Sequence, residues 1–211
     1  MTKLFKYPHT LHVPWSLGLQ NDDKRHPNIS VLYDREIVVT EKLDGENTGI
    51  TRESCHCRSL DSRDHLSRHF VKSLWGKIKN NIPENMTIFM ENCYAKHSIE
   101  YHNLTNYCYV FNICDGEKFL SWNEIVDYCQ LLDLEHVPVL YQGKWDEEKI
   151  KDCFTGKSLF GQEQEGYVIR SISSFMLKDF ENNVAKFVRK NHVQTSDHWM
   201  HGMVIQNKLK K

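Results

Sequence analysis

One lysine is distinguished by the residues around it. Lys42 ends the apolar run 36–42, and Asp44 and Gly45 follow it in the string EKLDGENTG. An exposed lysine amine is protonated near neutral pH and cannot attack, whereas partial burial or a nearby cation lowers its pKa and makes it nucleophilic. The setting of Lys42 therefore predicts a partly buried nucleophile, with Asp44 available to position the amine or a metal ion.

This short pattern also has a purely structural explanation, a strand that ends in an Asp-Gly turn with a solvated lysine. Four further segments, however, place charged or aromatic residues on strand-like runs in a definite order. They are TIFMENCYAKHSIEY with Glu91, YCYVFNICDG with Phe111, QEGYVIR with Glu165, and VAKFVRK with Lys186. The ordered set favours the chemical explanation.

Taken together, these segments resemble the motifs of the covalent nucleotidyltransferases, and most closely those of the ATP-dependent RNA ligases. The resemblance runs from about residue 36 to 195, with motif I at 42–45, motif III at 91, motif IIIa at 111, motif IV at 165–166 and motif V from 186. The strings EKLDGENTG, CRSLDSRDHLSRHFVKSLWG and ENCYAKHSIEY look like a compact branch of stand-alone RNA ligases.

The resemblance implies a reaction in three steps. Lys42 attacks the α-phosphate of ATP, the resulting lysyl-AMP passes AMP to the 5′-phosphate of an RNA, and a 3′-hydroxyl expels AMP to form the phosphodiester. Each step moves a charged phosphate, so the site needs basic side chains and Mg²⁺, for which Mn²⁺ can substitute. The alternatives are a DNA or RNA–DNA strand ligase, a GTP-dependent capping-type guanylyltransferase, and a catalytically inactive RNA-binding domain.

The same resemblance assigns roles to individual residues. The catalytic set is Lys42, Asp44, Glu165 and Lys186, of which Glu165 and Asp44 would hold the metal. The nucleotide-binding set is Glu41 at the adenine, Lys42, Asn47 near the phosphates, Arg58 at the nucleotide or the 5′-phosphate end, Glu91 at the ribose, Phe111 stacked on the base, Lys186 at the α-phosphate, and Lys190.

Three of these assignments have rivals or depart from the family pattern. Arg63 competes with Arg58 for the phosphate and is also a candidate for RNA binding, and Tyr109 could replace Phe111 under the base. In motif V, where the family usually carries a second lysine, this chain has Val188. Strand alternation places Lys190 on the face of Lys186, which makes Lys190 the expected second phosphate contact.

Further basic and aromatic residues suggest contacts with RNA. Lys96 and His97 follow the strand of Glu91, where they suit phosphate contact or base stacking. His192, His198 and His201 crowd the string NHVQTSDHWMHG. We expect this histidine-rich end to pack near the RNA-facing surface, although the sequence does not fix its role.

The elements that position these residues are mostly strands. Strand-like runs lie at 36–42, 47–52, 87–91, 107–114, 137–141, 165–172 and 183–189. Helical signals are the four-residue spacing from Leu66 to Ile78, the capping-box pattern of Ser121 and Glu124, and the shorter segment 145–154. The pattern predicts a single α+β nucleotidyltransferase (ATP-grasp-like) domain over 1–211, with mainly antiparallel sheets flanked by helices. About 20 residues follow Lys190, too few for an OB-fold.

Bulk composition excludes several classes of protein. The net charge of −1 excludes a globally basic nucleic-acid binder, so an RNA partner would have to meet a local basic face. The seven cysteines are an odd number in apolar contexts, which predicts reduced thiols and a cytoplasmic location, or the host cytoplasm for a viral protein. No apolar run reaches the roughly 20 residues of a membrane helix. We expect a monomer.

Overall fold

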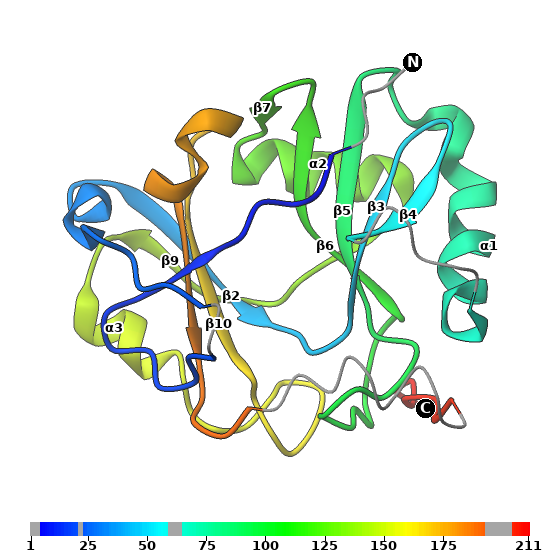
Figure 1. Ribbon diagram of the computed structural model, residues 1–211. Helices are drawn as coiled ribbons and strands as arrows, with labels where there is room; N and C mark the ends of the chain where they lie inside the picture. The colour runs from blue at the N-terminus through cyan, green and yellow to red at the C-terminus, as the bar shows by residue number, and fades with distance from the viewer. Residues whose placement is uncertain (1–4, 21–22, 59–64, 193–203) are drawn as a thin grey trace.

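The described part of the chain forms two β-sheets and three short α-helices (Figure 1), and the prediction of an α+β fold with mainly antiparallel sheets is confirmed. The computed structural model describes residues 5–20, 23–58, 65–192 and 204–211. Arg63, His198 and His201, which the sequence marked as candidates, lie outside these residues.

The first sheet carries the segment of the predicted nucleophile. In spatial order its strands are β1 (Leu11–His12), β12 (Val184–Val188), β10 (Gly166–Ser171), β2 (Glu36–Lys42) and β9 (Val139–Lys144). All neighbours are antiparallel except β1 and β12, which run parallel. The long strands match the predicted runs, whereas the two-residue β1 gave no signal in the sequence.

The second sheet carries the predicted ribose and base contacts. In spatial order its strands are β11 (Phe175–Met176), β7 (Lys118–Phe119), β6 (Cys108–Asp115), β5 (Met86–Asn92), β3 (Glu46–Ile50) and β4 (Cys55–Cys57), and β8 (Glu135–His136) pairs in parallel with β6. The chain builds β3 to β8 between β2 and β9, which are themselves neighbours in the first sheet. The second sheet is thus largely an insertion between two adjacent strands of the first.

Strand β2 is buried on both faces. Ile37 and Val39 pack into one hydrophobic cluster and Val38 packs into another, and all three side chains are fully buried. This two-sided burial explains why β2 reads as a continuous apolar run rather than as an alternating one. This burial also fixes the direction of the strand and therefore the position of Lys42 at its end.

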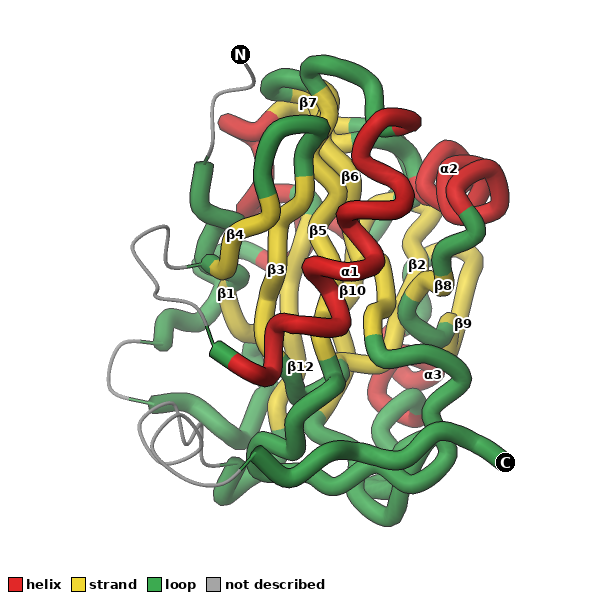
Figure 2. Tube along the Cα trace, turned by 90° about the vertical axis from the view of Figure 1, so that its right-hand side faces the viewer, coloured by secondary structure: helices red, strands yellow, loops and turns green. Residues whose placement is uncertain are grey.

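The helices lie outside the sheets. They are α1 (His69–Ile78), α2 (Trp122–Leu132) and α3 (Glu147–Asp152), together with the 3₁₀ turns Ile29–Leu32, Leu66–Arg68, Lys79–Asn81 and Leu177–Asn182. Figure 2 shows α1 running across the face of the second sheet over β3 and β5. The capping box of Ser121 and Glu124 is confirmed at the start of α2. Leu66 precedes α1 in a 3₁₀ turn and is exposed, so the predicted apolar stripe is wrong at its first position.

A buried arginine connects the two sheets. Arg170 on β10 donates to the Oδ1 atom of Asn112 on β6 (2.8 Å) and to the carbonyl of Leu120 (2.6 Å). A guanidinium suits this position because its fixed fork of donors satisfies two separate acceptors at once. The seven cysteines all lie in the described residues and form no disulfide, in agreement with the predicted reduced thiols. In the described ranges no helix has the length and apolar character needed to cross a membrane.

Candidate active site

The ends of two neighbouring strands bring Lys42 and Glu165 together. Lys42 is the last residue of β2 and lies opposite Gly166, the first residue of β10. Its Nζ atom is 2.7 Å from Oε1 and 2.8 Å from Oε2 of Glu165, which directly precedes β10. The Glu165 side chain is 1% exposed and that of Lys42 is 22% exposed. Main-chain pairing therefore fixes this contact although 123 residues separate the partners.

A second carboxylate approaches from the other sheet. The Glu91 side chain on β5 accepts a hydrogen bond from the Gly45 N–H (3.0 Å), and Glu91 lies opposite Asn47 in the β3–β5 register. A Cβ atom at position 45 would lie 2.6 Å from the carbonyl oxygen of Asn92. The glycine of the Lys-x-Asp-Gly pattern is thus required by the close approach of β5.

The charges of the site determine the protonation of Lys42. Burial alone would lower the pKa of Lys42, but the carboxylates of Glu165, Glu91 and Asp44 raise it well above its ordinary range. The expectation of a lowered pKa is therefore wrong for the structure, because carboxylates rather than cations surround the amine. Burial also raises the pKa of Glu91 to about 8. Burial opposes ionisation of Glu165 too, yet Lys42 and His192 hold its pKa below the usual value.

Asp44 lies in the link between β2 and β3 rather than on either strand. Its Oδ2 atom accepts three hydrogen bonds, from the N–H of Ser98, the hydroxyl of Ser98 and the N–H of Ile99, at 2.7–2.8 Å. Its Oδ1 atom lies 3.9 Å from Nε2 of His192. One oxygen is held by the protein, and the other faces Glu165 and His192.

These three side chains form a candidate metal site. Ligand atoms of Asp44, Glu165 and His192 lie within 4.8 Å of one another, and all three residues are buried. The structure therefore brings together the two predicted metal ligands and adds a histidine that the sequence left without a role. Carboxylate oxygens and an imidazole nitrogen are suitable donors for a divalent cation.

Glu41 occupies a separate buried position directly before Lys42. Its Oε2 atom accepts a hydrogen bond from the N–H of Leu159 (3.2 Å). Its Oε1 atom is buried and has no hydrogen-bond partner within the described part of the chain. Burial raises the pKa of this carboxyl group. An acceptor in this state is available to a ligand with an amino group.

Lys186 on β12 is held by an acid that the sequence did not single out. Its Nζ atom lies 3.0 Å from Oδ1 of Asp23, and the same oxygen lies 3.0 Å from Nε2 of His12. His12 in turn contacts the hydroxyl of Ser16 (2.7 Å). The N-terminal segment thus neutralises Lys186 from one side. It does so because β1 runs alongside β12 and pairs His12 with Lys186.

The predicted base-stacking residue lies in an aromatic cluster. Phe111 on β6 is half-buried, and its ring centroid is 5.0 Å from that of Tyr7, with the rings nearly perpendicular. Tyr109, its rival, is fully buried. The Tyr109 hydroxyl accepts hydrogen bonds from the N–H groups of Thr105 and Asn106. Only Phe111 of the two therefore retains an accessible ring.

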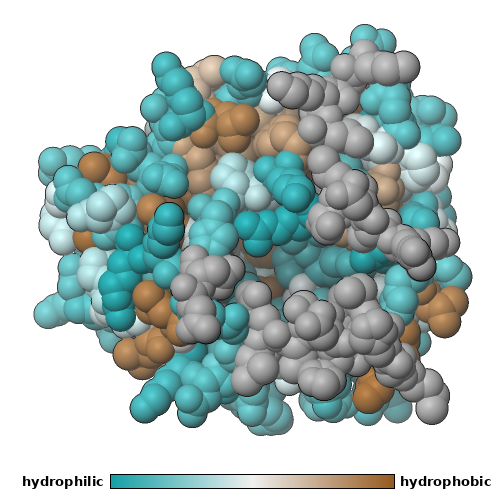
Figure 3. All heavy atoms as spheres, in the orientation of Figure 1, coloured by the Kyte–Doolittle hydropathy of each residue, from teal (hydrophilic) through white to brown (hydrophobic). Residues whose placement is uncertain are grey.

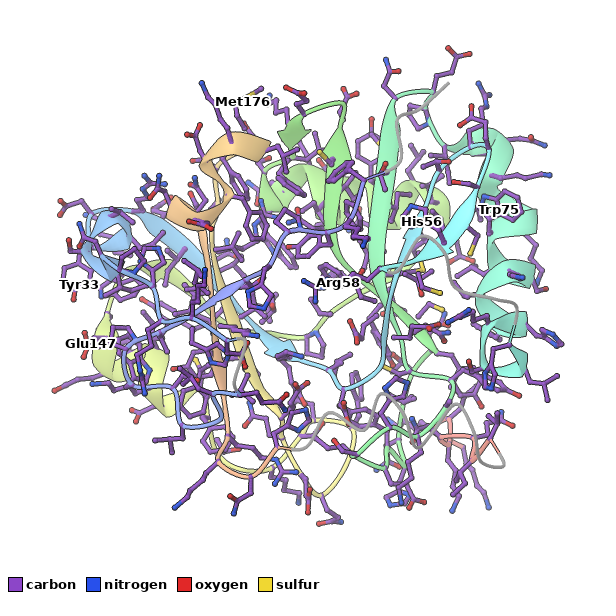
Figure 4. The ribbon with its side chains drawn as sticks, viewed as in Figure 1. Tyr33, His56, Arg58, Trp75, Glu147 and Met176 are labelled. Carbon is purple, nitrogen blue, oxygen red and sulfur yellow. The ribbon has the colours of Figure 1, made fainter. Side chains whose placement is uncertain are left out.

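Other predicted contacts are spread around this centre. Arg58 is exposed, and its side chain lies near the middle of Figure 4 between β2 and β3. Figure 3 shows hydrophilic residues gathered in the middle of the same face. His97 is half-buried, and its pKa is lowered mainly by burial. Lys96 pairs with Glu100 (3.1 Å).

The strand argument for Lys190 is wrong, because β12 ends at Val188. Lys190 follows the strand and is exposed, and Arg189 pairs with Glu163 (2.8 Å). The two-residue alternation therefore stops before it reaches Lys190, and its side chain is not placed on the face of Lys186.

A comparison with known protein families assigns the chain. The family model for RNA ligases matches residues 35–188, which include β2, β5, β6, β10 and β12 with Lys42, Glu91 and Glu165. The chain belongs to the RNA ligase family. Among curated proteins, none matches it.

Solved structures of ligases share the fold of this RNA ligase family member. A putative ATP-dependent DNA ligase from Aquifex aeolicus is 20% identical, with a TM-score of 0.60, and the match covers 88% of this chain and 50% of that chain. A Naegleria gruberi RNA ligase with pyrophosphate is 19% identical, with a TM-score of 0.59 and coverage of 90% and 59%. A mutant of the Naegleria ligase with ATP and Mn is 18% identical, with a TM-score of 0.58 and coverage of 89% and 59%. The chain thus spans about half to three fifths of the length of these ligases.

Several residues that shape the site of this family member were not predicted from the sequence. His12, Ser16 and Asp23 precede the first motif and carry no local pattern. Their role depends on a parallel strand pair that joins distant parts of the chain. His192 was noticed only as part of a histidine-rich string. The turn that returns it to Glu165 follows β12 and has no signature in the sequence.

Proposed function

We propose that the protein is an ATP-dependent RNA ligase that joins 3′-hydroxyl and 5′-phosphate ends through a lysyl-AMP at Lys42. The observation that carries this proposal is the buried contact between Lys42 and Glu165, with Glu91 beside it. Membership of the RNA ligase family supports it, as does a similar fold in a Naegleria gruberi RNA ligase with ATP and Mn.

In the first step, Nζ of Lys42 forms a bond to the α-phosphorus of ATP, and pyrophosphate leaves with the electrons of the broken P–O bond. The amine must be deprotonated to attack, while the surrounding carboxylates favour its charged form. A divalent cation held by Asp44 and Glu165 would offset those carboxylates and stabilise the charge on the phosphates. Lys186 would contact the α-phosphate once Asp23 releases it.

The nucleotide would be oriented by groups around Lys42. The free oxygen of Glu41 would accept a hydrogen bond from the amino group of adenine. Phe111 would stack on the base, and Glu91 would contact the ribose. Asn47 and Arg58, which border the same face, would contact the phosphates or the incoming 5′-end.

A basic pocket supports a polynucleotide substrate. The C-terminal segment packs beside Lys96, whose N–H donates to the carbonyl of Ile205 (2.7 Å). A pocket of about 710 Å³ next to this segment is lined, among others, by His102, Tyr107, Lys208, Lys210 and Lys211. Several cations in one pocket are the side chains expected for phosphate contact. We propose that one strand of the RNA lies here, with Lys96 and His97 at its border.

The principal alternative is a DNA strand ligase, because the putative DNA ligase of Aquifex aeolicus has a similar fold. A ligation assay with RNA ends and DNA ends, both single-stranded and splinted, separates the two functions. Faster joining of RNA ends supports the proposal, whereas joining of DNA ends alone would reject it.

The covalent step is tested with labelled ATP and labelled GTP. With ATP and a divalent metal, we expect a protein adduct whose mass increases by one AMP. The adduct should be absent in Lys42→Ala and unchanged in Lys144→Ala, which alters an exposed lysine at the end of β9. An adduct from GTP alone would favour a guanylyltransferase. Absence of any adduct from the wild-type protein would favour a non-catalytic RNA-binding role.

A further inference from the structure

The candidate metal site includes a histidine from outside the motifs that the sequence revealed. Asp44 comes from the link after β2, Glu165 directly precedes β10, and His192 follows β12. Their side chains are 9%, 1% and 2% exposed, respectively. Three buried ligand-type side chains from distant parts of the chain therefore converge on one point.

The spacing of their ligand atoms fits a bound cation. Nε2 of His192 lies 3.0 Å from Oε1 of Glu165 and 3.9 Å from Oδ1 of Asp44. Two ligand atoms that are each about 2.1 Å from a cation lie about 3 Å apart when the ligand–cation–ligand angle is a right angle. They lie about 4 Å apart when they are on opposite sides of the cation. The observed separations fall in this range.

The hydrogen bonding of these two atoms is incomplete. Oε1 of Glu165 and Nε2 of His192 are buried and make no hydrogen bond of full geometry to a described residue, although they lie 3.0 Å apart and Nζ of Lys42 lies 2.7 Å from Oε1. Buried ligand-type atoms with incomplete hydrogen bonding are available to a cation. Lys42 also lies beside Glu165, so its ammonium group and a cation would compete for this carboxylate.

Surrounding contacts hold the histidine and the aspartate in place. Gln20 donates to the carbonyl of His192 (3.4 Å), and the hydroxyl of Ser98 lies 3.5 Å from Nδ1 of the same ring. The same hydroxyl donates to Oδ2 of Asp44 (2.7 Å). Partners of this kind orient metal ligands in proteins, because they fix the ring and leave the other nitrogen free.

We infer that His192 supplies an imidazole nitrogen to the divalent cation held by Asp44 and Glu165, and that this nitrogen makes the site favour Mn²⁺ over Mg²⁺. Mg²⁺ prefers oxygen ligands and keeps its water, whereas imidazole suits first-row transition metals. The inference rests on the proposed function only in that the cation would serve the ligase reaction.

The test measures metal binding to the full chain without ATP. Titration of Mn²⁺ monitored by electron paramagnetic resonance gives its affinity, and competition gives that of Mg²⁺. We expect His192→Gln to weaken Mn²⁺ binding about 10-fold or more, the scale of effect of residues around metal sites. Mg²⁺ binding should change much less. The control is His69→Gln, which alters an exposed histidine at the start of α1.

A spectroscopic measurement decides the case even if His192→Gln fails to fold. Pulsed electron paramagnetic resonance of Mn²⁺ bound to the wild-type protein should show coupling to a directly bound nitrogen. The coupling should be retained in His69→Gln and lost in a folded His192→Gln. Absence of nitrogen coupling in the wild-type protein, or its persistence together with unchanged affinity in His192→Gln, would overturn the inference.

The result of this metal-binding test can be distinguished from the result of the adduct test of the proposed function. Nitrogen coupling without any adduct from ATP would leave the metal site in place and reject the ligase. An adduct from ATP without nitrogen coupling would support the ligase and reject the role of His192.

Discussion

Lys42 and Glu165 form a buried pair that main-chain hydrogen bonding sets in register, since Lys42 lies opposite the residue that follows Glu165. The strongest charge interaction of the site thus depends on strand pairing rather than on a flexible loop. The carboxylate holds the amine in place and would also bind the cation that the reaction requires.

Replacement of this carboxylate tests its dual role. Glu165→Gln should slow the formation of lysyl-AMP about 100- to 1000-fold, because it removes the charge beside Lys42 and one ligand of the cation. The rate is measured with labelled ATP under single-turnover conditions. Glu163→Gln is the matched control, because Glu163 is 58% exposed and pairs only with Arg189 among the ion pairs of the described residues. Equal rates for the two variants would reject a catalytic role for Glu165.

The Lys186–Asp23 pair should contribute measurably to stability. Each side chain is only about one tenth exposed, so loss of one partner leaves a poorly solvated charge. A double-mutant cycle of Asp23→Asn and Lys186→Met, measured by urea unfolding, should give a coupling free energy of about 2 kcal/mol. The exposed pair Lys149–Asp146 should give much weaker coupling, because solvent screens both charges. Equal coupling in the two cycles would contradict the burial argument.

His12 should make stability depend on pH in the acidic range. Burial, with help from Lys186, lowers the pKa of His12 from 6.5 to about 4. Between these values the unfolded chain binds a proton that the folded chain does not, so the free energy of unfolding falls as the pH drops from 6.5 toward 4. The contribution is up to about 3 kcal/mol.

The measurement compares urea unfolding of the wild-type protein and His12→Gln at pH 7.5 and at pH 5. Stability of the wild-type protein should fall more steeply than that of the variant over this interval. Above about pH 7 the histidine is neutral in both states and adds no pH dependence. Parallel pH profiles for the two proteins would show that His12 does not titrate differently on unfolding.

Arg170 should be sensitive even to a conservative change. Arg170→Lys keeps the positive charge but cannot donate to Asn112 and Leu120 at the same time, so buried acceptors lose their partners. We expect a loss of about 3 kcal/mol in the free energy of unfolding. Arg52→Lys, at an exposed pair with Glu84, should cost about 0.5 kcal/mol or less. A similar small loss at Arg170 would mean that the link between the sheets is dispensable.

The sequence was sufficient for the features that depend on local pattern. The long strands β2, β5, β6 and β10 appeared as apolar runs close to their observed bounds, and Ser121 marked the start of α2. Motif order predicted that Lys42, Glu91 and Glu165 would share a site, and the structure brings their side chains together.

Features that depend on long-range pairing could not be predicted. Asp23 approaches Lys186 only because a two-residue strand runs parallel to β12, and such a strand has no periodicity to detect. His192 returns to Glu165 through a turn, and β12 ends before Lys190, so strand alternation does not place the Lys190 side chain. The pKa of Lys42 was mispredicted because it depends on three carboxylates brought in by different strands.

The place of the second sheet between β2 and β9 has a practical consequence. The segment that builds β3 to β8 leaves and returns at two strands that are hydrogen-bonded to each other, so its two attachment points are close in space. This segment can therefore be treated in protein engineering as one exchangeable unit. It could be exchanged with the equivalent segment of a relative to alter the residues that we propose to contact the nucleotide, while Lys42 and Glu165 remain on the recipient framework.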